Sequence, residues 1–158
     1  MIDDLNIGLV VSRFNWEIVE PLLNQTMEQL EVKGFNEEEI SIYPVPGALE
    51  IPIITRKVSL FHDVIICLGA VVRGETTHYD IVSEQVSRAL ADISLVIDTP
   101  IINGILTVEN QQQGLDRVNR GSYFADSAVD MGVLCHKLDE EKESLLAEFD
   151  DYPMFEEN

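Results

Sequence analysis

One polar turn, Arg73-Gly-Glu-Thr-Thr-His78, carries the residue types best suited to handling a phosphorylated small molecule. Its backbone N–H groups and the hydroxyls of Thr76 and Thr77 could cradle a phosphate in front of the helix that the following spacing predicts. Histidine is the side chain used most often for proton transfer at neutral pH, so His78 could exchange a proton beside such an anion. The same residues also fit a capped helix start with a structural histidine, so the turn alone leaves both interpretations open.

Two further side chains stand in settings that are unusual for their types. Phe14 lies in a polar turn, where an exposed ring can stack on a planar ligand, although an aromatic packed under a neighbour fits equally well. Glu50 lies among apolar residues, where its carboxylate either accepts hydrogen bonds from ligand hydroxyls or favours the dipole of a helix start. Taken alone, Glu50 slightly favours the second interpretation.

Two of the few basic residues, Arg117 and Arg120, lie between the last two expected helices. Arginine is suited to bidentate contact with a phosphate. In a chain this acidic, neutralising nearby carboxylates on the surface is an equally good use for them.

The apolar pattern predicts strands that alternate with helices and bring these turns together. Short apolar or alternating runs predict strands at residues 5–11, 40–45, 62–69 and 101–107. Helical spacing predicts helices at residues 16–33, 80–97, 109–118 and 121–149. A further helix is predicted to begin at the break over residues 46–50 and to end near residue 59. Such alternation indicates a parallel sheet with helices on both faces. The turns at 12–15, 46–50 and 73–78 would then share the rim at the carboxyl ends of the strands, where such sheets bind ligands.

Glycines mark several expected boundaries. Gly34 predicts the end of the first helix, and Gly69 and Gly74 predict a break after the third strand. Gly104, inside the fourth strand, predicts a close approach of another part of the chain.

The totals limit the class of protein. The 158 residues suit a single domain over residues 1–158, and 46% hydrophobic content excludes a disordered chain. Ten basic against 29 acidic residues give a formal charge of −19, which argues against a nucleic-acid partner. No apolar run reaches the roughly 18 residues that a membrane span needs, and the N-terminus lacks the basic start of a secretory signal. We therefore expect a cytoplasmic protein without membrane contact.

The acidic residues concentrate in a C-terminal extension, residues 139–158, which holds nine acids and one lysine. We expect a solvated helix end followed by a frayed terminus there. Cys67 and Cys135 are expected to be small buried hydrophobes rather than a disulfide. The histidines have no ligand spacing with each other or with cysteine, so no metal site is expected.

Four blocks, in order and spacing, resemble one enzyme family. They are Phe14-Asn15, Val45-Pro-Gly-Ala-Leu-Glu-Ile-Pro52, Gly69-Ala-Val-Val-Arg-Gly-Glu-Thr-Thr-His78 and Gly104-Ile-Leu-Thr-Val-Glu-Asn110. Over about residues 5–131 the chain resembles the 6,7-dimethyl-8-ribityllumazine synthase family of riboflavin biosynthesis. The resemblance implies a flavodoxin-like α/β fold, a three-layer α/β/α sandwich with a four-stranded parallel sheet.

The resemblance also implies a reaction between two small molecules. It implies condensation of 5-amino-6-(D-ribitylamino)uracil with 3,4-dihydroxy-2-butanone 4-phosphate, releasing phosphate and water. The first substrate brings its own amine nucleophile and the second its own leaving group, so no cofactor is expected. Matching positions imply His78 for proton transfer and Glu75 (through its backbone), Thr76, Arg117 and Arg120 for phosphate. They imply substrate-binding roles for Phe14, Asn15, Ala48, Leu49, Glu50, Ala70, Val71, Val72 and Asn103.

Family resemblance further implies a homo-oligomer, a pentamer or a multiple of pentamers, with active sites between subunits. Asn103 and Arg117 would face the site of the adjacent subunit. Two departures from the family pattern stand out. Asn103 occupies a position that is often aromatic, and a glycine-rich, lysine-containing insert is missing after Arg117. Arg120 is a candidate to replace that lysine.

Two other functions remain to be tested against this one. A flavodoxin-like FMN carrier would need a glycine- and hydroxyl-rich loop after the first strand, and Ser12-Arg-Phe-Asn-Trp16 has no glycine. A riboflavin synthase on the same fold would instead convert two lumazine molecules.

Overall fold

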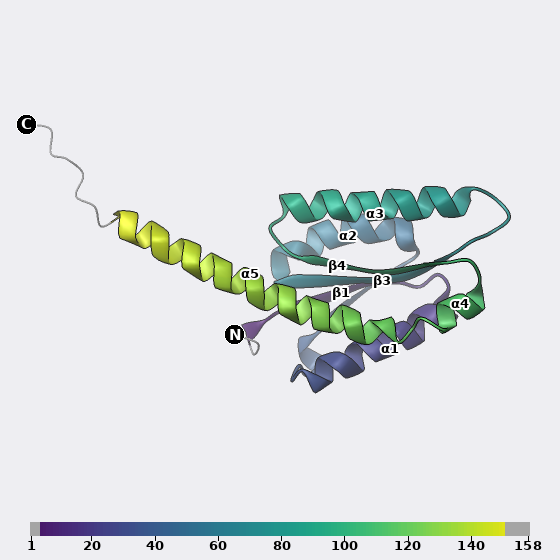
Figure 1. Cartoon of the computed structure of the whole chain (residues 1–158), viewed down its shortest axis with the longest axis horizontal. Helices are drawn as coiled ribbons and strands as arrows, with labels where there is room; N and C mark the ends of the chain where they lie inside the picture. Colours follow the sequence, from purple (N-terminus) through teal and green to yellow (C-terminus); the bar gives the residue numbers. More distant parts are fainter. Residues whose placement is uncertain (1–3, 151–158) are drawn as a thin grey trace, which may run out of the picture.

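Four parallel strands form one sheet in the order β2-β1-β3-β4 in the computed structural model, which describes residues 4–150 (Figure 1). Their bounds are β1 Ile7–Ser12, β2 Ser41–Val45, β3 Val64–Val72 and β4 Ile101–Val108. Each connection between successive strands contains a helix, as a parallel sheet requires. The predicted four-stranded parallel sheet is confirmed.

Helices cover both faces of the sheet and complete the three layers (Figure 1). One face carries α1 (Trp16–Val32), α4 (Gln111–Leu115) and α5 (Arg120–Asp150), and the other carries α2 (Ile51–Val58) and α3 (His78–Val96). Short 3₁₀ turns, η2 (Glu37–Glu39), η3 (Ala48–Glu50) and η4 (Ser59–Phe61), lie in the connections. The α/β/α sandwich therefore agrees with the fold expected from the sequence.

The two central strands, β1 and β3, are buried on both faces, which explains their unbroken apolar sequences. Alternate residues point to opposite layers: Leu9 and Ile66 pack with α1 and α5, whereas Val10 and Cys67 pack with α2 and α3. Cys67 is a buried hydrophobe, as predicted, and burial raises the pKa of its thiol to about 12. Cys135 is only half-buried.

Two glycines behave as the sequence predicts. Gly34 follows α1 with a φ of 103°, a left-handed conformation that ends the helix. Gly104 lies so close to its surroundings that a Cβ there would meet Leu68 at 2.7 Å and Phe124 of α5 at 2.9 Å. β4 can therefore pack tightly beneath α5.

Three predicted boundaries are wrong, one because of pairing with a neighbouring strand and two because of local helix capping and turns. β3 continues through Gly69 to Val72 because Gly69 keeps its register opposite Ile105 of β4. α3 begins at His78 rather than Asp80, with Thr77 as its N-cap. The helix predicted over 109–118 is limited to α4, because Asn110 caps it and tighter turns follow Leu115.

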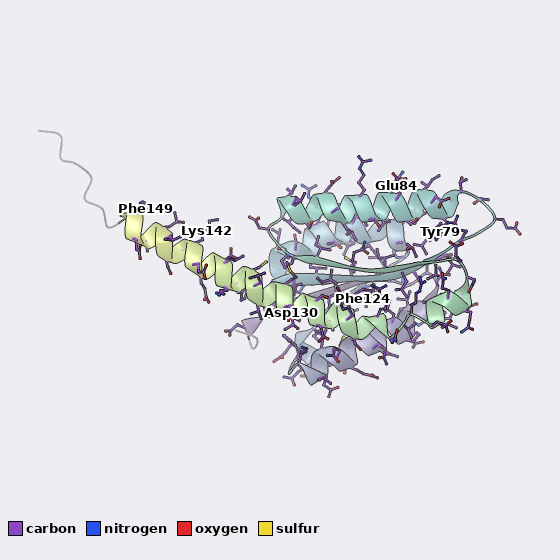
Figure 2. The ribbon with its side chains drawn as sticks, in the orientation of Figure 1. Tyr79, Glu84, Phe124, Asp130, Lys142 and Phe149 are labelled. Atoms are coloured by element: carbon purple, nitrogen blue, oxygen red, sulfur yellow. The ribbon has the colours of Figure 1, made fainter. Side chains whose placement is uncertain are left out.

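Beyond the sheet, α5 continues as a free helix (Figure 2). Phe124 lies over the sheet, whereas Lys142 and Phe149 lie on the part that extends away (Figure 2). Exposed apolar side chains on this part include Leu138, Leu145 and Leu146. The solvated helix end is therefore confirmed for residues 139–149, and the predicted frayed terminus lies outside the described residues. Within residues 4–150, no helix is long and apolar enough to cross a membrane.

Candidate active site

A cavity of about 340 Å³ opens at the carboxyl end of the sheet. It lies where the turns after β1 and β2 meet the end of β3 and the first turn of α3. The three turns expected to share one rim therefore do so. The lining residues are Phe14, Asn15, Gly47, Ala48, Leu49, Glu50, Ala70, Val71, Val72, Gly74, Thr76, His78, Tyr79 and Val82.

The turn after β1 presents an open aromatic ring to this cavity. Phe14 is 69% exposed, so its ring is not packed under a neighbour and its face is free for a planar ligand. The next residue, Asn15, holds a left-handed backbone with a φ of 56°. Its side-chain amide donates a hydrogen bond of 2.8 Å to the Ala70 carbonyl of β3. Asn15 thereby fixes the position of Phe14 relative to the sheet.

Glu50 stands at the N-cap of α2, but its side chain makes no capping hydrogen bond. The carboxylate instead lines the cavity and lies near Gly47, where a Cβ would meet Glu50 Oε2 at 3.0 Å. An exposed carboxylate that does not cap its own helix is available to ligand hydroxyls. Glu50 thus lies both at the cavity and at the start of α2, and its ligand-binding role stays a prediction.

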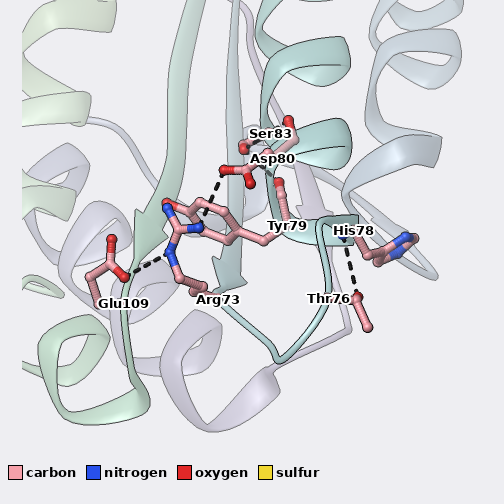
Figure 3. Close-up of polar contacts among 7 residues, drawn as sticks. All are labelled: Arg73, Thr76, His78, Tyr79, Asp80, Ser83 and Glu109. Atoms are coloured by element: carbon pink, nitrogen blue, oxygen red, sulfur yellow. Dashed lines mark hydrogen bonds and ion pairs between the residues drawn. The ribbon is translucent and has the colours of Figure 1, made fainter.

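The turn between β3 and α3 carries the residues expected to handle phosphate and protons (Figure 3). The Thr76 hydroxyl accepts a weak hydrogen bond of 3.4 Å from the His78 N–H. Both side chains line the cavity, with His78 exposed at the first position of α3. Glu75 is exposed and does not line it. Thr76 and His78 thus lie together at the N-terminus of α3, a position that suits an anionic ligand.

Arg73, at the start of this turn, makes three contacts at the rim of the cavity (Figure 3). Its Nε donates a hydrogen bond of 2.7 Å to Glu109, and its Nη1 lies 3.4 Å from Asp80. Its guanidinium also stacks over the Tyr79 ring, 4.4 Å from the centroid. The hydrogen bond to Glu109 raises the pKa of Arg73 above its ordinary value.

Four predicted site residues do not line the cavity of their own chain: Glu75, described above, and Asn103, Arg117 and Arg120. Asn103 is exposed on the edge strand β4, where its Oδ1 accepts a hydrogen bond of 3.2 Å from the Ile105 N–H. Arg117 is exposed in the turn after α4, and Arg120 begins α5 with its guanidinium 5.7 Å from the Phe124 ring. The cavity of one chain therefore contains Phe14 and His78 but neither of the expected arginines.

Four lining residues were not predicted as site residues: Gly47, Gly74, Tyr79 and Val82. Both glycines stand inside the motifs that carried the family resemblance. Tyr79 and Val82 follow His78 by one and four residues, a spacing that turns helical side chains toward one region. Knowing that α3 begins at His78 would have identified them.

The part of the chain that the structure describes contains no cluster of side chains suited to bind a metal ion. No group of three or more His, Cys, Asp or Glu side chains in residues 4–150 could hold a metal ion. The side chains that line the cavity instead offer aromatic rings, a carboxylate, hydroxyls and an imidazole. Such groups can stack on a ligand, form hydrogen bonds with it and transfer protons.

Comparison with known proteins identifies the family of the chain. The family model for 6,7-dimethyl-8-ribityllumazine synthase matches residues 4–136. A 6,7-dimethyl-8-ribityllumazine synthase of Clostridium kluyveri is 41% identical over 144 residues, covering 87% of this chain and 94% of that protein. One of Nitrosospira multiformis is 43% identical over 141 residues, covering 87% of this chain and 88% of that protein. The chain therefore belongs to the 6,7-dimethyl-8-ribityllumazine synthase family, transferases of riboflavin biosynthesis.

Proposed function

We propose that the chain condenses 5-amino-6-(D-ribitylamino)uracil with 3,4-dihydroxy-2-butanone 4-phosphate to give 6,7-dimethyl-8-ribityllumazine, phosphate and water. The observation that carries this proposal is the single cavity that gathers Phe14, Glu50, Thr76 and His78. These four residues come from three separate turns. Their side chains suit the planar ring, the sugar-like hydroxyls, the phosphate and the proton transfers of that reaction, respectively.

The cavity divides into regions that match the two substrates. Phe14 stacks on the pyrimidine ring, and Ala70, Val71 and Val72 at the end of β3 line the ring pocket. The segment Ala48–Glu50 holds the ribityl chain, with Glu50 accepting hydrogen bonds from its hydroxyls. The apolar strand end excludes water from the ring while the polar residues orient the chain.

The second substrate binds where α3 begins. Thr76 and the backbone at Glu75 hold its phosphate at the helix N-terminus. The amine of the first substrate attacks the ketone of the second, and His78 moves the protons that this addition and the later loss of phosphate require. Holding both substrates in one cavity further accelerates the reaction, because it makes the reaction effectively unimolecular.

The missing cationic side chains come from a second copy of the chain. Arg117 and Arg120 lie outside their own cavity, yet an anionic leaving group calls for a positive partner. We place Asn103, Arg117 and Arg120 in the site of an adjacent subunit of a pentamer or a multiple of pentamers. The enzyme functions as a single domain over residues 1–158 in the cytoplasm.

Purified protein mixed with both substrates tests the proposal. We expect lumazine absorbance to appear together with one equivalent of phosphate, and neither to appear when one substrate is left out. Phosphate release without lumazine, or no reaction, would reject it.

Two control incubations separate the competing functions. Supplying lumazine alone and finding riboflavin would assign the riboflavin synthase reaction instead. A purified protein that is yellow with stoichiometric FMN, and inactive toward both substrates, would assign a flavin carrier. Solution mass then distinguishes a pentamer from a larger assembly.

A further inference from the structure

A single exposed guanidinium joins three elements at the rim of the cavity. We propose that Arg73 is a positioning residue, which ties the turn 73–78 to the end of β4 through Glu109 and to the start of α3 through Asp80 and Tyr79. In this role Arg73 sets where Thr76, His78 and Tyr79 stand around the cavity. The inference rests on the proposed function for its kinetic consequence but not for its structural one.

Arg73 is anchored at both its backbone and its side chain. Its backbone N–H donates a hydrogen bond of 2.9 Å to the Val108 carbonyl, the last residue of β4. Its side chain then reaches Glu109, the next residue along that strand's exit. The turn therefore leaves the sheet in a fixed direction, held to β4 by two successive residues.

The far side of the guanidinium reaches the first turn of α3. Nη1 lies 3.4 Å from Asp80, and the plane covers the Tyr79 ring at 4.4 Å from its centroid. Ser83 braces the same helical turn, because its hydroxyl donates a hydrogen bond of 2.6 Å to the Tyr79 carbonyl (Figure 3). Since His78 precedes Tyr79 and both line the cavity, fixing Tyr79 fixes the start of the helix that presents His78.

Only arginine can make this set of contacts at once. A planar guanidinium offers donors in different directions and a flat face for an aromatic ring. Lysine would pair with Glu109 or with Asp80, but its compact ammonium cannot hold both carboxylates and stack on Tyr79. The three contacts therefore specify arginine rather than a positive charge alone.

The solvent exposure of the Arg73, Asp80 and Glu109 side chains indicates whether their contacts serve stability or the cavity. The Arg73, Asp80 and Glu109 side chains are 42%, 57% and 58% exposed. Ion pairs this exposed contribute little to global stability. A network that stabilises the fold weakly but borders the cavity on one side is expected to affect substrate turnover more than unfolding.

Arg73→Met, compared with Arg88→Met, tests the proposal. Both variants remove one positive charge. Arg88 is an exposed arginine within α3, the helix whose first turn Arg73 contacts, and neither arginine lines the cavity. We expect Arg73→Met to lower kcat/KM by roughly tenfold to a hundredfold, because small displacements of catalytic groups cost that much. Arg88→Met should behave as the unsubstituted protein.

Hydrogen exchange provides a readout that needs no substrate. Amides of residues 74–78 should exchange faster in Arg73→Met than in Arg88→Met, while amides of β1 and β3 remain unchanged. Arg73→Lys should recover part of the activity and part of the protection. Combining Arg73→Met with Glu109→Gln should cost little more than Arg73→Met alone, because both changes break the same contact.

Each outcome decides whether Arg73 positions the turn 73–78. Unchanged exchange at residues 74–78 would overturn the inference, as would faster exchange with unchanged kcat/KM. Loss of activity in step with a large fall in Tm, equal in Arg73→Met and Arg73→Lys, would assign Arg73 to general stability instead. If the unsubstituted protein forms no lumazine, the proposed function fails, and the exchange comparison still decides whether Arg73 holds the turn.

Discussion

The side-chain amide of Asn15 donates a hydrogen bond of 2.8 Å to the backbone carbonyl of Ala70. This contact joins the turn after β1 to β3, whose end lines the cavity. It also occurs at one of two non-glycine residues with positive φ in residues 4–150. Asparagine is among the few residues that adopt a left-handed backbone readily. Its residue type therefore suits both the backbone conformation and the side-chain hydrogen bond.

Replacing Asn15 separates these two contributions. Asn15→Gly keeps the left-handed backbone accessible and loses mainly the hydrogen bond, at about 1 kcal/mol of unfolding free energy. Asn15→Ala loses the hydrogen bond and also strains the backbone, so we expect about 2 to 3 kcal/mol. Urea denaturation measures both. Equal stability of the two variants would show that the backbone conformation carries no cost.

Gly47 should control the position of Glu50. Its backbone is extended, with a φ of −154°, so alanine is conformationally allowed there, but the new Cβ would meet Glu50 Oε2 at 3.0 Å. We expect Gly47→Ala to raise the KM for the ribityl substrate by a few-fold because Glu50 must move. In a Glu50→Ala background the same change should have almost no effect. An undiminished effect in that background would exclude Glu50 as the cause.

His78 should matter for turnover and little for folding. It is exposed at the start of α3, so His78→Ala is expected to leave Tm nearly unchanged while lowering kcat by about a hundredfold or more. His62→Ala is the matched comparison, because His62 is buried and bonds to Tyr43 at 2.7 Å and Asn6 at 2.8 Å. That variant should lower Tm and leave the kcat of the folded fraction intact. The reverse pattern would exchange the two roles.

The pH dependence of stability should carry a contribution from His62. Burial lowers the pKa of His62 below its ordinary value of 6.5. As pH falls through the ordinary value, the unfolded chain therefore binds a proton before the folded one does, and the folded state loses stability. This contribution is present above about pH 6.5 and is lost toward the lower folded pKa.

The His62→Gln variant, whose residue 62 cannot titrate, isolates the contribution of His62 to the pH dependence of stability. Unfolding free energies measured between pH 5 and 8 should fall more steeply toward acid in the unsubstituted protein than in the variant. Taking the difference between the two removes the effect of the many carboxylates, which both proteins share. Parallel curves would mean that His62 has the same pKa folded and unfolded.

Local patterns predicted most of the fold because each signal acts within one element. Buried parallel strands require unbroken apolar runs, and Gly34 and Gly104 mark a helix end and a close approach that other residues cannot provide. Boundaries that depend on a neighbouring strand were missed. Gly69 is locally a strand breaker, yet pairing with β4 keeps it in the sheet and extends β3 to Val72.

The candidate site divides in the same way. Phe14, Glu50 and His78 were candidates from their unusual settings and from the rule that parallel sheets bind ligands at the carboxyl rim, and the family resemblance then implied their site roles. Tyr79 was missed because its place in the cavity depends on where α3 begins, and Arg73 because its partners Asp80 and Glu109 come from different segments. The expected roles of Arg117 and Arg120 depend on another chain, which periodicity within one sequence does not describe.

Arg117 provides the sharpest test of a site shared between subunits. On the proposed function, Arg117→Ala mainly raises the KM for the phosphate substrate, because the residue contacts phosphate and lies outside its own cavity. Arg120→Ala, made in parallel, shows which arginine takes that role. If neither variant changes this KM, the arginines are surface residues that neutralise nearby acids.

Mixing two defective chains then asks whether the site is built from two copies. His78→Ala chains retain Arg117, and Arg117→Ala chains retain His78, so each alone should be poorly active at substrate concentrations well below KM. In a ring assembled at random from equal amounts, about one site in four receives an intact His78 from one chain and an intact Arg117 from its neighbour. Co-expressed hybrids should therefore recover about a quarter of the unsubstituted activity. Activity no higher than the average of the two separate variants would mean that His78 and Arg117 do not serve one site across a subunit boundary.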